Sequence, residues 1–291
     1  MPDDSLYPFT VKKISIQGHN LSFLDQGRGR VIVMLHGNPT WSYYYRNLVT
    51  HLQKKYRVIV PDHMGCGYSD KPQDYPYTLK THIDNLEILL AEQKIEKYSL
   101  VVHDWGGAIG MGLAVRYPER LESIVVLNTA AFRFGRIPLR ISICRVPLLG
   151  DIIVRGFNGF ARAALTMAVA NKMTPDIARG YLKPYDSWAN RVALLRFVQD
   201  IPVTGKNVSW QTLVEIENNL TKLLNIPMLV LWGGRDFCFT KKFYSEWLKR
   251  FPEAEHYLFP AAGHYVLEDA FEDIAPLITV FFQKYLSDNE S

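Results

Sequence analysis

At Val101-Val-His-Asp-Trp-Gly-Gly107, a predicted buried strand meets a predicted helix. Asp104 falls on the turn between the two elements. An aspartate at such a junction can be only a helix N-cap, whose side chain accepts hydrogen bonds from backbone N–H groups. A sharp strand-to-helix turn backed by small residues, here Gly106 and Gly107, can instead hold a reactive side chain above the end of a sheet. The remainder of the chain decides between these two interpretations.

Strand-like runs alternate with helix-length segments on both sides of this turn. The alternation predicts crossover connections and an α/β fold with a mostly parallel, eight-stranded sheet flanked by helices. The predicted strands are 11–16, 21–25, 31–35, 57–60, 99–102, 123–127, 228–232 and 256–259. The predicted helices are 41–53, 79–92, 106–116, 241–250 and 266–284.

The alternation stops between about residues 132 and 220. This stretch contains helix-like apolar patches and several prolines, with no convincing strand, and a strand-like run returns at 226–232. We therefore predict a core formed by residues 1–131 and 221–291. A helical cap formed by residues 132–220 is inserted after the sixth strand and covers the site.

Length and composition narrow the class of protein. The 291 residues suffice for one α/β domain with an inserted cap. Hydrophobic residues make up 48% and charged residues 21%, as in an ordinary soluble globular protein. The net charge of +4 is too small, and too evenly spread, to indicate a nucleic-acid partner. No apolar run approaches the roughly 20 residues that a membrane span needs.

The cysteines and the N-terminus indicate a compartment. Cys66, Cys144 and Cys238 are scattered without C-x-x-C spacing, which predicts reduced thiols, no disulfide framework and no zinc site. The first residues lack the pattern of a signal peptide. We expect a cytoplasmic protein that needs no metal and no organic cofactor.

Two later segments complete a pattern that begins at Asp104. Asp236 ends the segment Trp232-Gly-Gly-Arg-Asp236, and His264 ends Ala262-Gly-His264. Alone, each could be a helix cap or a surface residue. Both follow predicted strands, and the order nucleophile, acid, histidine is the order of the α/β-hydrolase fold. The sequence therefore predicts the catalytic triad Asp104, Asp236 and His264.

A second loop supplies hydrogen-bond donors to the predicted site. His36-Gly-Asn-Pro-Thr40 follows the apolar strand 31–35. In this fold the loop after that strand gives one backbone N–H of an oxyanion hole, and the residue after the nucleophile gives the other. These would be the N–H groups of Asn38 and Trp105. The alternative for a Gly-Asn-Pro segment is an ordinary turn.

These motifs together resemble those of the haloalkane dehalogenases. Asp104-Trp105 and the segment from His36 to Tyr43 match that family's nucleophile and halide-pocket motifs. The resemblance implies that Asn38 and Trp105 bind the leaving group through their side-chain N–H groups. Other dehalogenases carry the acid as a glutamate after the sixth strand. Here that strand ends at Asn128, which leaves the role to Asp236.

The chain is similar in more detail to OleB-type β-lactone decarboxylases of long-chain olefin biosynthesis. The stretches that carry this resemblance are 127–132, 155–158, 184–188, 197–202, 235–237 and 263–269. Several of them lie in the predicted cap, where substrate choice is made. The resemblance implies a small hydrophobic substrate and sister enzymes of olefin biosynthesis as partners.

An aspartate nucleophile suits the displacement of a leaving group from a carbon atom. Attack by Asp104 on a saturated carbon leaves an ester that water can cleave, whereas serine would leave a stable ether. His264, oriented by Asp236, would act as general base on that water. A halide leaves without a proton, and so does the carboxylate of an opened β-lactone. The sequence leaves open which lactone carbon is attacked.

The favoured reaction is β-lactone decarboxylation to a cis-alkene, and the alternative is hydrolytic dehalogenation of haloalkanes. Epoxide hydrolysis is a third candidate, in which Tyr181 and Tyr185 would activate the epoxide oxygen. A non-catalytic small-molecule receptor that retains a triad is the candidate from another class.

Five arginines are spaced through an apolar segment at the start of the predicted cap. They form either a solvated face or a surface that docks a partner protein or a lipid-like substrate. They are Arg133, Arg136, Arg140, Arg145 and Arg155.

Overall fold

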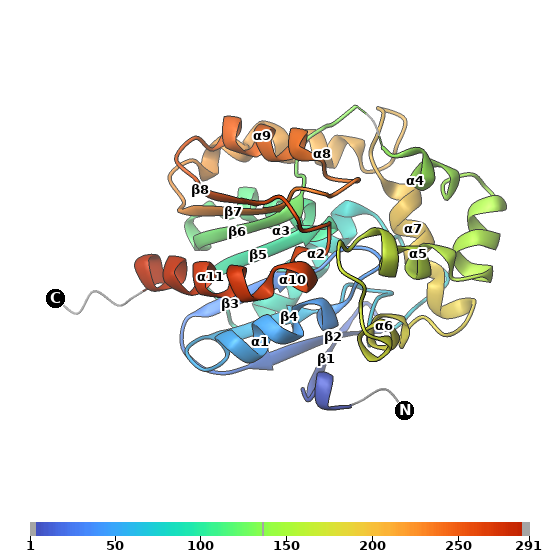
Figure 1. Cartoon of the computed structure of the whole chain (residues 1–291), viewed down its shortest axis with the longest axis horizontal. Coiled ribbons are helices and arrows are strands. Elements are labelled where there is room, and N and C mark those ends of the chain that lie inside the picture. Colours follow the sequence, from blue (N-terminus) through green and yellow to red (C-terminus); the bar gives the residue numbers. More distant parts are fainter. Residues whose placement is uncertain (1–3, 136, 287–291) are drawn as a thin grey trace.

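The computed structural model describes residues 4–135 and 137–286, and its central element is one eight-stranded sheet (Figure 1). The strand order is β1-β2-β4-β3-β5-β6-β7-β8. The strands are β1 (Val11–Ile16), β2 (His19–Gln26), β3 (Val31–Leu35), β4 (Arg57–Pro61), β5 (Tyr98–Asp104), β6 (Leu121–Thr129), β7 (Met228–Gly233) and β8 (Glu255–Phe259). β2 pairs antiparallel with β1 and β4, and the remaining neighbouring strands pair parallel. The predicted fold class is confirmed.

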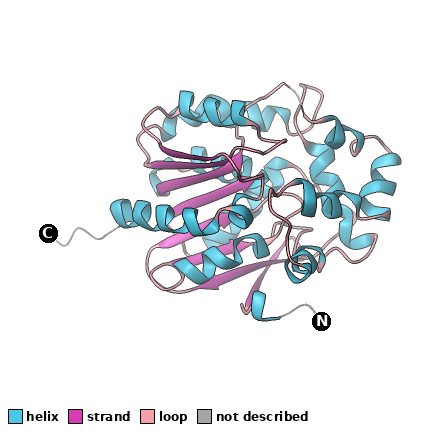
Figure 2. Cartoon of the chain, viewed as in Figure 1, coloured by secondary structure: helices cyan, strands magenta, loops and turns pink. Residues whose placement is uncertain are grey.

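Helices cover both faces of the sheet (Figure 2). The helices around it are α1 (Arg46–Leu52), α2 (Leu79–Glu92), α3 (Trp105–Arg116), α9 (Lys241–Arg250), α10 (Val266–Asp269) and α11 (Phe271–Leu286). α1 and α11 pack together on one face, and α2 and α3 pack together on the other. Burial on both faces explains why the central strands are apolar throughout.

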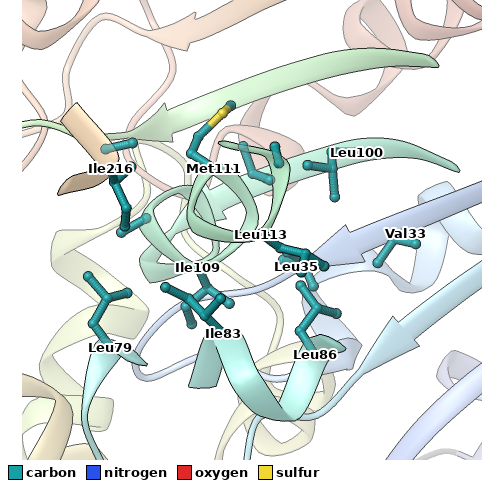
Figure 3. Packing of buried hydrophobic residues seen from close by; sticks show 14 of the residues in the cluster. Val33, Leu35, Leu79, Ile83, Leu86, Leu100, Ile109, Met111, Leu113 and Ile216 are labelled. Carbon is teal, nitrogen blue, oxygen red and sulfur yellow. The ribbon is translucent and has the colours of Figure 1, made fainter. Parts of the chain in front are cut away.

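Successive residues of the central strands pack alternately into two hydrophobic cores, one on each face of the sheet. Val33 and Leu35 of β3 belong to the cluster under α2 and α3, where they pack near Ile83 and Ile109 (Figure 3). Their neighbour Met34 belongs to the cluster on the opposite face. This alternation follows from the two-residue period of a strand. It fixes β3 and β5 rigidly, so the loops at their ends start from defined positions.

Two predicted helices differ from the observed elements. The predicted helix 266–284 is wrong as a single helix, because Ala270 (φ −139°) separates α10 from α11. The predicted helix 41–53 begins as a short 3-10 turn at Ser42–Tyr45 and becomes α-helical only at Arg46.

Between β6 and β7 the described residues form helices and loops, with no strand. The helices are α4 (Leu139–Ile143), a π-helical turn (Asp151–Gly156), α5 (Gly159–Met167), α6 (Pro175–Leu182), α7 (Val192–Asp200) and α8 (Trp210–Asn219). α4 to α7 lie beside one end of the sheet, whereas α8 packs against α3 and α2 (Figure 1). Among the described helices, none is both long and apolar enough to cross a membrane.

Candidate active site

Asp104 occupies a sharp turn between β5 and α3. Its backbone has φ +52° and ψ −126°, a conformation that residues other than glycine rarely adopt. The backbone packs so closely that a Cβ added to Gly106 would lie 2.0 Å from the carbonyl oxygen of Leu35. A Cβ added to Gly37 would lie 2.0 Å from Oδ1 of Asp104. The small residues around Asp104 are therefore required by the turn.

The Asp104 carboxylate is held between a backbone donor and a histidine. Its Oδ1 accepts a hydrogen bond from the backbone N–H of Asn38 at 2.7 Å, and its Oδ2 lies 3.5 Å from Nε2 of His264. Burial would raise the pKa of this carboxyl group, but the hydrogen bond and charge of His264 outweigh burial and lower it. Asp104 is therefore ionised at neutral pH.

His264 lies between two carboxylates. Its Nδ1 is 2.7 Å from Oδ2 of Asp236, and the other oxygen of Asp236 accepts from the backbone N–H groups of Cys238 and Phe239 at 2.6 and 3.0 Å. Burial alone would lower the pKa of His264, but the charges and hydrogen bonds of Asp236 and Asp104 raise it to about 10. The ring is therefore an imidazolium in the resting site.

Asn128, near the end of β6, fixes the predicted acid. Its side-chain N–H donates to Oδ2 of Asp236 at 3.0 Å, and its amide oxygen accepts from the backbone N–H of Gly233 at 2.8 Å. The sequence indicated only that Asn128 could not be the charged acid. The bond to Asp236 was missed because it joins residues more than 100 positions apart. The available signal in the sequence was an amide side chain directly after an apolar strand.

Asn38 and Trp105 flank the carboxylate of Asp104, and all three line one cavity. The Asn38 amide nitrogen donates to the carbonyl oxygen of Leu194 in α7 at 3.0 Å, while its Oδ1 is buried without a partner. An amide nitrogen carries two N–H groups, so one remains after this bond. Within residues 4–135 and 137–286, the indole N–H of Trp105 has no acceptor.

The cavity has a volume of about 430 Å³, and its lining is predominantly apolar. Side chains from the loops after the strands and from the segment between β6 and β7 form its wall. They include Phe132, Ile141, Phe160, Met167, Leu213 and Phe239. Asp104 and His264 contribute ionised groups to this wall. The cavity is suited to a hydrophobic ligand whose reacting carbon lies against Asp104. In the part of the chain that is described, no group of three metal-ligating side chains is placed to hold an ion.

Residues 30–271 match the family model described as alpha/beta hydrolase fold. The chain belongs to this family. It is 46% identical to the cis-3-alkyl-4-alkyloxetan-2-one decarboxylase of Shewanella oneidensis over 285 residues, which are 96% of this chain and 90% of that protein. The enzyme of the same name from Xanthomonas campestris is 40% identical over 292 residues, covering 96% of this chain and 97% of that protein.

Solved structures agree with the assignment to the α/β-hydrolase family. The haloalkane dehalogenase DatA from Agrobacterium tumefaciens superposes with a TM-score of 0.87 at 25% sequence identity, over 98% of this chain and all of that one. The resemblance to both groups, expected from the motifs, is confirmed.

In this α/β hydrolase, the loop that carries His264 is tied to the segment after α5. The backbone N–H of Tyr265 donates to the carbonyl oxygen of Ala168 at 2.7 Å. The carboxylate of Asp269 accepts from the backbone N–H groups of Gly263, Ala170 and Asn171 at 2.8 to 2.9 Å. The sequence assigned no role to Asp269, because two of its three partners, Ala170 and Asn171, lie 99 and 98 positions away in the chain.

The two tyrosines that the sequence offered for epoxide activation form hydrogen bonds outside the cavity. The hydroxyl group of Tyr181 donates to Glu268, which also forms a buried ion pair with Arg46. The hydroxyl group of Tyr185 donates to the carbonyl oxygen of Thr40 at 3.1 Å. Neither residue lines the cavity that contains Asp104. The hydrolase therefore offers neither hydroxyl group to an epoxide oxygen.

Proposed function

We propose that this hydrolase decarboxylates a cis-3,4-dialkyl β-lactone to a cis-alkene, with Asp104 as the nucleophile. The main support is the match of nearly the whole chain to two relatives that are named for this reaction. An ionised carboxylate in the wall of an apolar cavity supports the same reaction. The lactone has two alkyl chains that fit an apolar cavity and a reactive ring carbon that the carboxylate can attack.

In the first step, an oxygen of Asp104 attacks the saturated ring carbon that is bonded to the ring oxygen. A new ester C–O bond forms, the ring C–O bond breaks, and the electron pair stays on the released carboxylate. That carboxylate needs no proton. The free N–H of the Asn38 amide and the indole N–H of Trp105 bind it, since both donors line the cavity beside Asp104.

In the second step, the bond between the carboxylate carbon and its neighbouring ring carbon breaks to release CO₂. The electron pair forms the C=C bond, and the ester C–O bond breaks to return Asp104 as a carboxylate. The alkene and CO₂ account for every atom of the lactone, so no water is consumed. Attack with inversion followed by anti elimination converts a cis ring into a cis-alkene.

His264 then acts mainly through its charge. An imidazolium 3.5 Å from Oδ2 stabilises the Asp104 carboxylate as it is expelled, and Asp236 keeps that ring protonated and oriented. The sequence-based scheme, in which His264 activates water to cleave the ester, applies to a hydrolytic reaction.

Haloalkane dehalogenation is the second candidate, favoured by the structural likeness to a haloalkane dehalogenase. The same carboxylate would displace a halide, which Asn38 and Trp105 would hold. Conversion of Asp104 to a neutral ester removes a charge that raises the pKa of His264. The imidazolium would then release its proton to solvent. The neutral ring of His264 could act as the base that activates water, which cleaves the ester and releases an alcohol.

We further propose that residues 132–220 act as a cap over a core of residues 1–131 and 221–291. The contribution of α5 and of the loop before α4 to the cavity wall supports this division. The free thiols of Cys66, Cys144 and Cys238 fit a reducing, cytoplasmic setting. Sister enzymes that make the lactone would be its functional partners.

The two candidate functions are separated by product analysis. Purified protein is incubated with a long-chain cis-β-lactone and, in parallel, with a bromoalkane of similar length, and products are identified by gas chromatography. We expect alkene from the lactone at a much higher kcat/KM than any alcohol from the bromoalkane. Bromide and alcohol without any alkene would instead establish a dehalogenase.

A further inference from the structure

The segment from α4 to the end of the π-helical turn carries an unusual share of exposed apolar side chains. They are Leu139, Ile143, Val146, Leu148, Leu149, Ile152 and Phe157, and we call them the 139–157 face. Leu139, Leu148 and Phe157 are 75%, 79% and 72% exposed. Figure 1 shows this segment at the outer edge of the molecule, away from α11. A cluster of protruding aliphatic and aromatic groups on one segment indicates a binding surface.

Arginines predominate in and next to this face. Residues 131–150 contain four arginines and neither aspartate nor glutamate. Arg140 is exposed and Arg145 is half-buried. Arg133 is exposed but forms an ion pair with Glu217, and Arg136 lies outside the described residues. The first acidic residue, Asp151, lies 3.8 Å from the guanidinium group of Arg155, so it is already matched by a cation.

The same segment borders the cavity. Ile141, Cys144 and Ile153 lie between the exposed residues in the sequence, and all three line the cavity that contains Asp104. A surface bound to the 139–157 face would therefore lie close to the wall of the active site.

We propose that the 139–157 face docks on the surface of a bilayer that contains anionic lipids. Apolar side chains next to arginines match the two components of an interfacial membrane site, one entering the acyl region and the other pairing with phosphates. A second copy of this chain fits less well, because a symmetric contact would bring arginines against arginines. If the proposed function also holds, docking would let a lactone dissolved in the bilayer pass directly toward the cavity.

The test is co-sedimentation of the full chain with phosphatidylglycerol vesicles and, separately, with phosphatidylcholine vesicles. We expect binding to the anionic vesicles that weakens as salt is raised. Leu148→Ser and Phe157→Ser should each lower the partition coefficient about tenfold, since each removes one apolar side chain that would enter the acyl region of the bilayer. Arg145→Gln should lower it about fivefold on phosphatidylglycerol vesicles and much less on neutral ones.

Val280→Ser is the matched control, because Val280 is 63% exposed on α11, far from this face. It should bind vesicles like the parent protein, and all variants should keep the parent's melting temperature within a few degrees. Absence of binding to phosphatidylglycerol vesicles would overturn the proposal, and so would equal losses in Val280→Ser and Leu148→Ser. Self-association in sedimentation that Leu148→Ser abolishes, without vesicle binding, would assign the face to a second copy instead. These outcomes are independent of turnover, so they do not depend on the decarboxylase assignment.

Discussion

The side-chain N–H of Asn128 donates to Oδ2 of Asp236 at 3.0 Å, the same oxygen that lies 2.7 Å from His264. This oxygen of Asp236, which follows β7, therefore binds both Asn128 in β6 and His264 in the loop after β8. The other oxygen is held by backbone N–H groups, so Asp236 has little freedom to rotate. The orientation of His264 depends on this arrangement.

Asn128→Ala should lower the free energy of unfolding by about 1–3 kcal/mol, because it leaves the buried N–H of Gly233 without its acceptor. It should also lower turnover, since Asp236 loses a positioning bond. Denaturant unfolding and steady-state kinetics measure the two effects. Asn218→Ala, at an exposed asparagine, is the control and should stay within about 0.5 kcal/mol of the parent. Equal stability of both variants would contradict the role given to Asn128.

The charge of His264 predicts a pH dependence of stability. The folded-state pKa of about 10 lies above the ordinary value of 6.5, so this ion pair stabilises the fold fully below pH 6.5. Its contribution is lost as pH rises toward 10. Asp104→Asn should flatten this decline, because it removes one of the two charges that raise the pKa of His264. Thermal unfolding at a series of pH values checks this, and an unchanged slope in the variant would argue against the coupling.

Substitution of His264 distinguishes hydrolysis of the ester on Asp104 from its cleavage during loss of CO₂. In His264→Gln, a bromoalkane should leave a stable alkyl ester on Asp104, because no base activates water. A cis-β-lactone should leave no lasting adduct, since CO₂ loss expels Asp104 without water, although the rate falls. Intact-mass spectrometry after equal incubations distinguishes them. An equally persistent adduct from the lactone would contradict the water-free second step.

Asp269→Asn should lower kcat about tenfold or more with little change in KM. The carboxylate of Asp269 anchors Gly263, next to His264, to the backbone at Ala170 and Asn171, so its loss displaces the histidine. Asp273→Asn, an exposed aspartate on α11, is the matched control. A rise in KM alone, with kcat unchanged, would assign Asp269 to substrate binding and not to positioning.

The sequence predicted the sheet well because its signals are local. Strands 11–16 and 31–35 have their predicted bounds, and helices 79–92 and 241–250 do as well. Uninterrupted apolar runs and amphipathic periods are properties of the segment itself. The order of Asp104, Asp236 and His264 in the fold could be predicted for the same reason, since each follows a recognisable strand.

The sequence could not predict contacts that depend on tertiary packing. The break at Ala270 interrupts a segment that is helix-like throughout, and it coincides with the anchoring of Asp269 to a distant loop. The bond between Asn38 and Leu194 likewise joins residues 156 positions apart. Such contacts follow from the packing of whole elements and leave no periodic pattern in the chain.

If Asp104 is the nucleophile that opens the β-lactone, Asp104→Asn should form almost no alkene. The substitution keeps the size of the side chain, which the tight turn at Asp104 requires, and removes the nucleophilic charge. Purified parent and variant are incubated with a long-chain cis-β-lactone, and the alkene is measured by gas chromatography. We predict cis-alkene from the parent and at least a thousandfold less from a folded variant, on the order of 4 kcal/mol of transition-state stabilisation. Comparable amounts of alkene from both proteins would show that Asp104 is not the nucleophile.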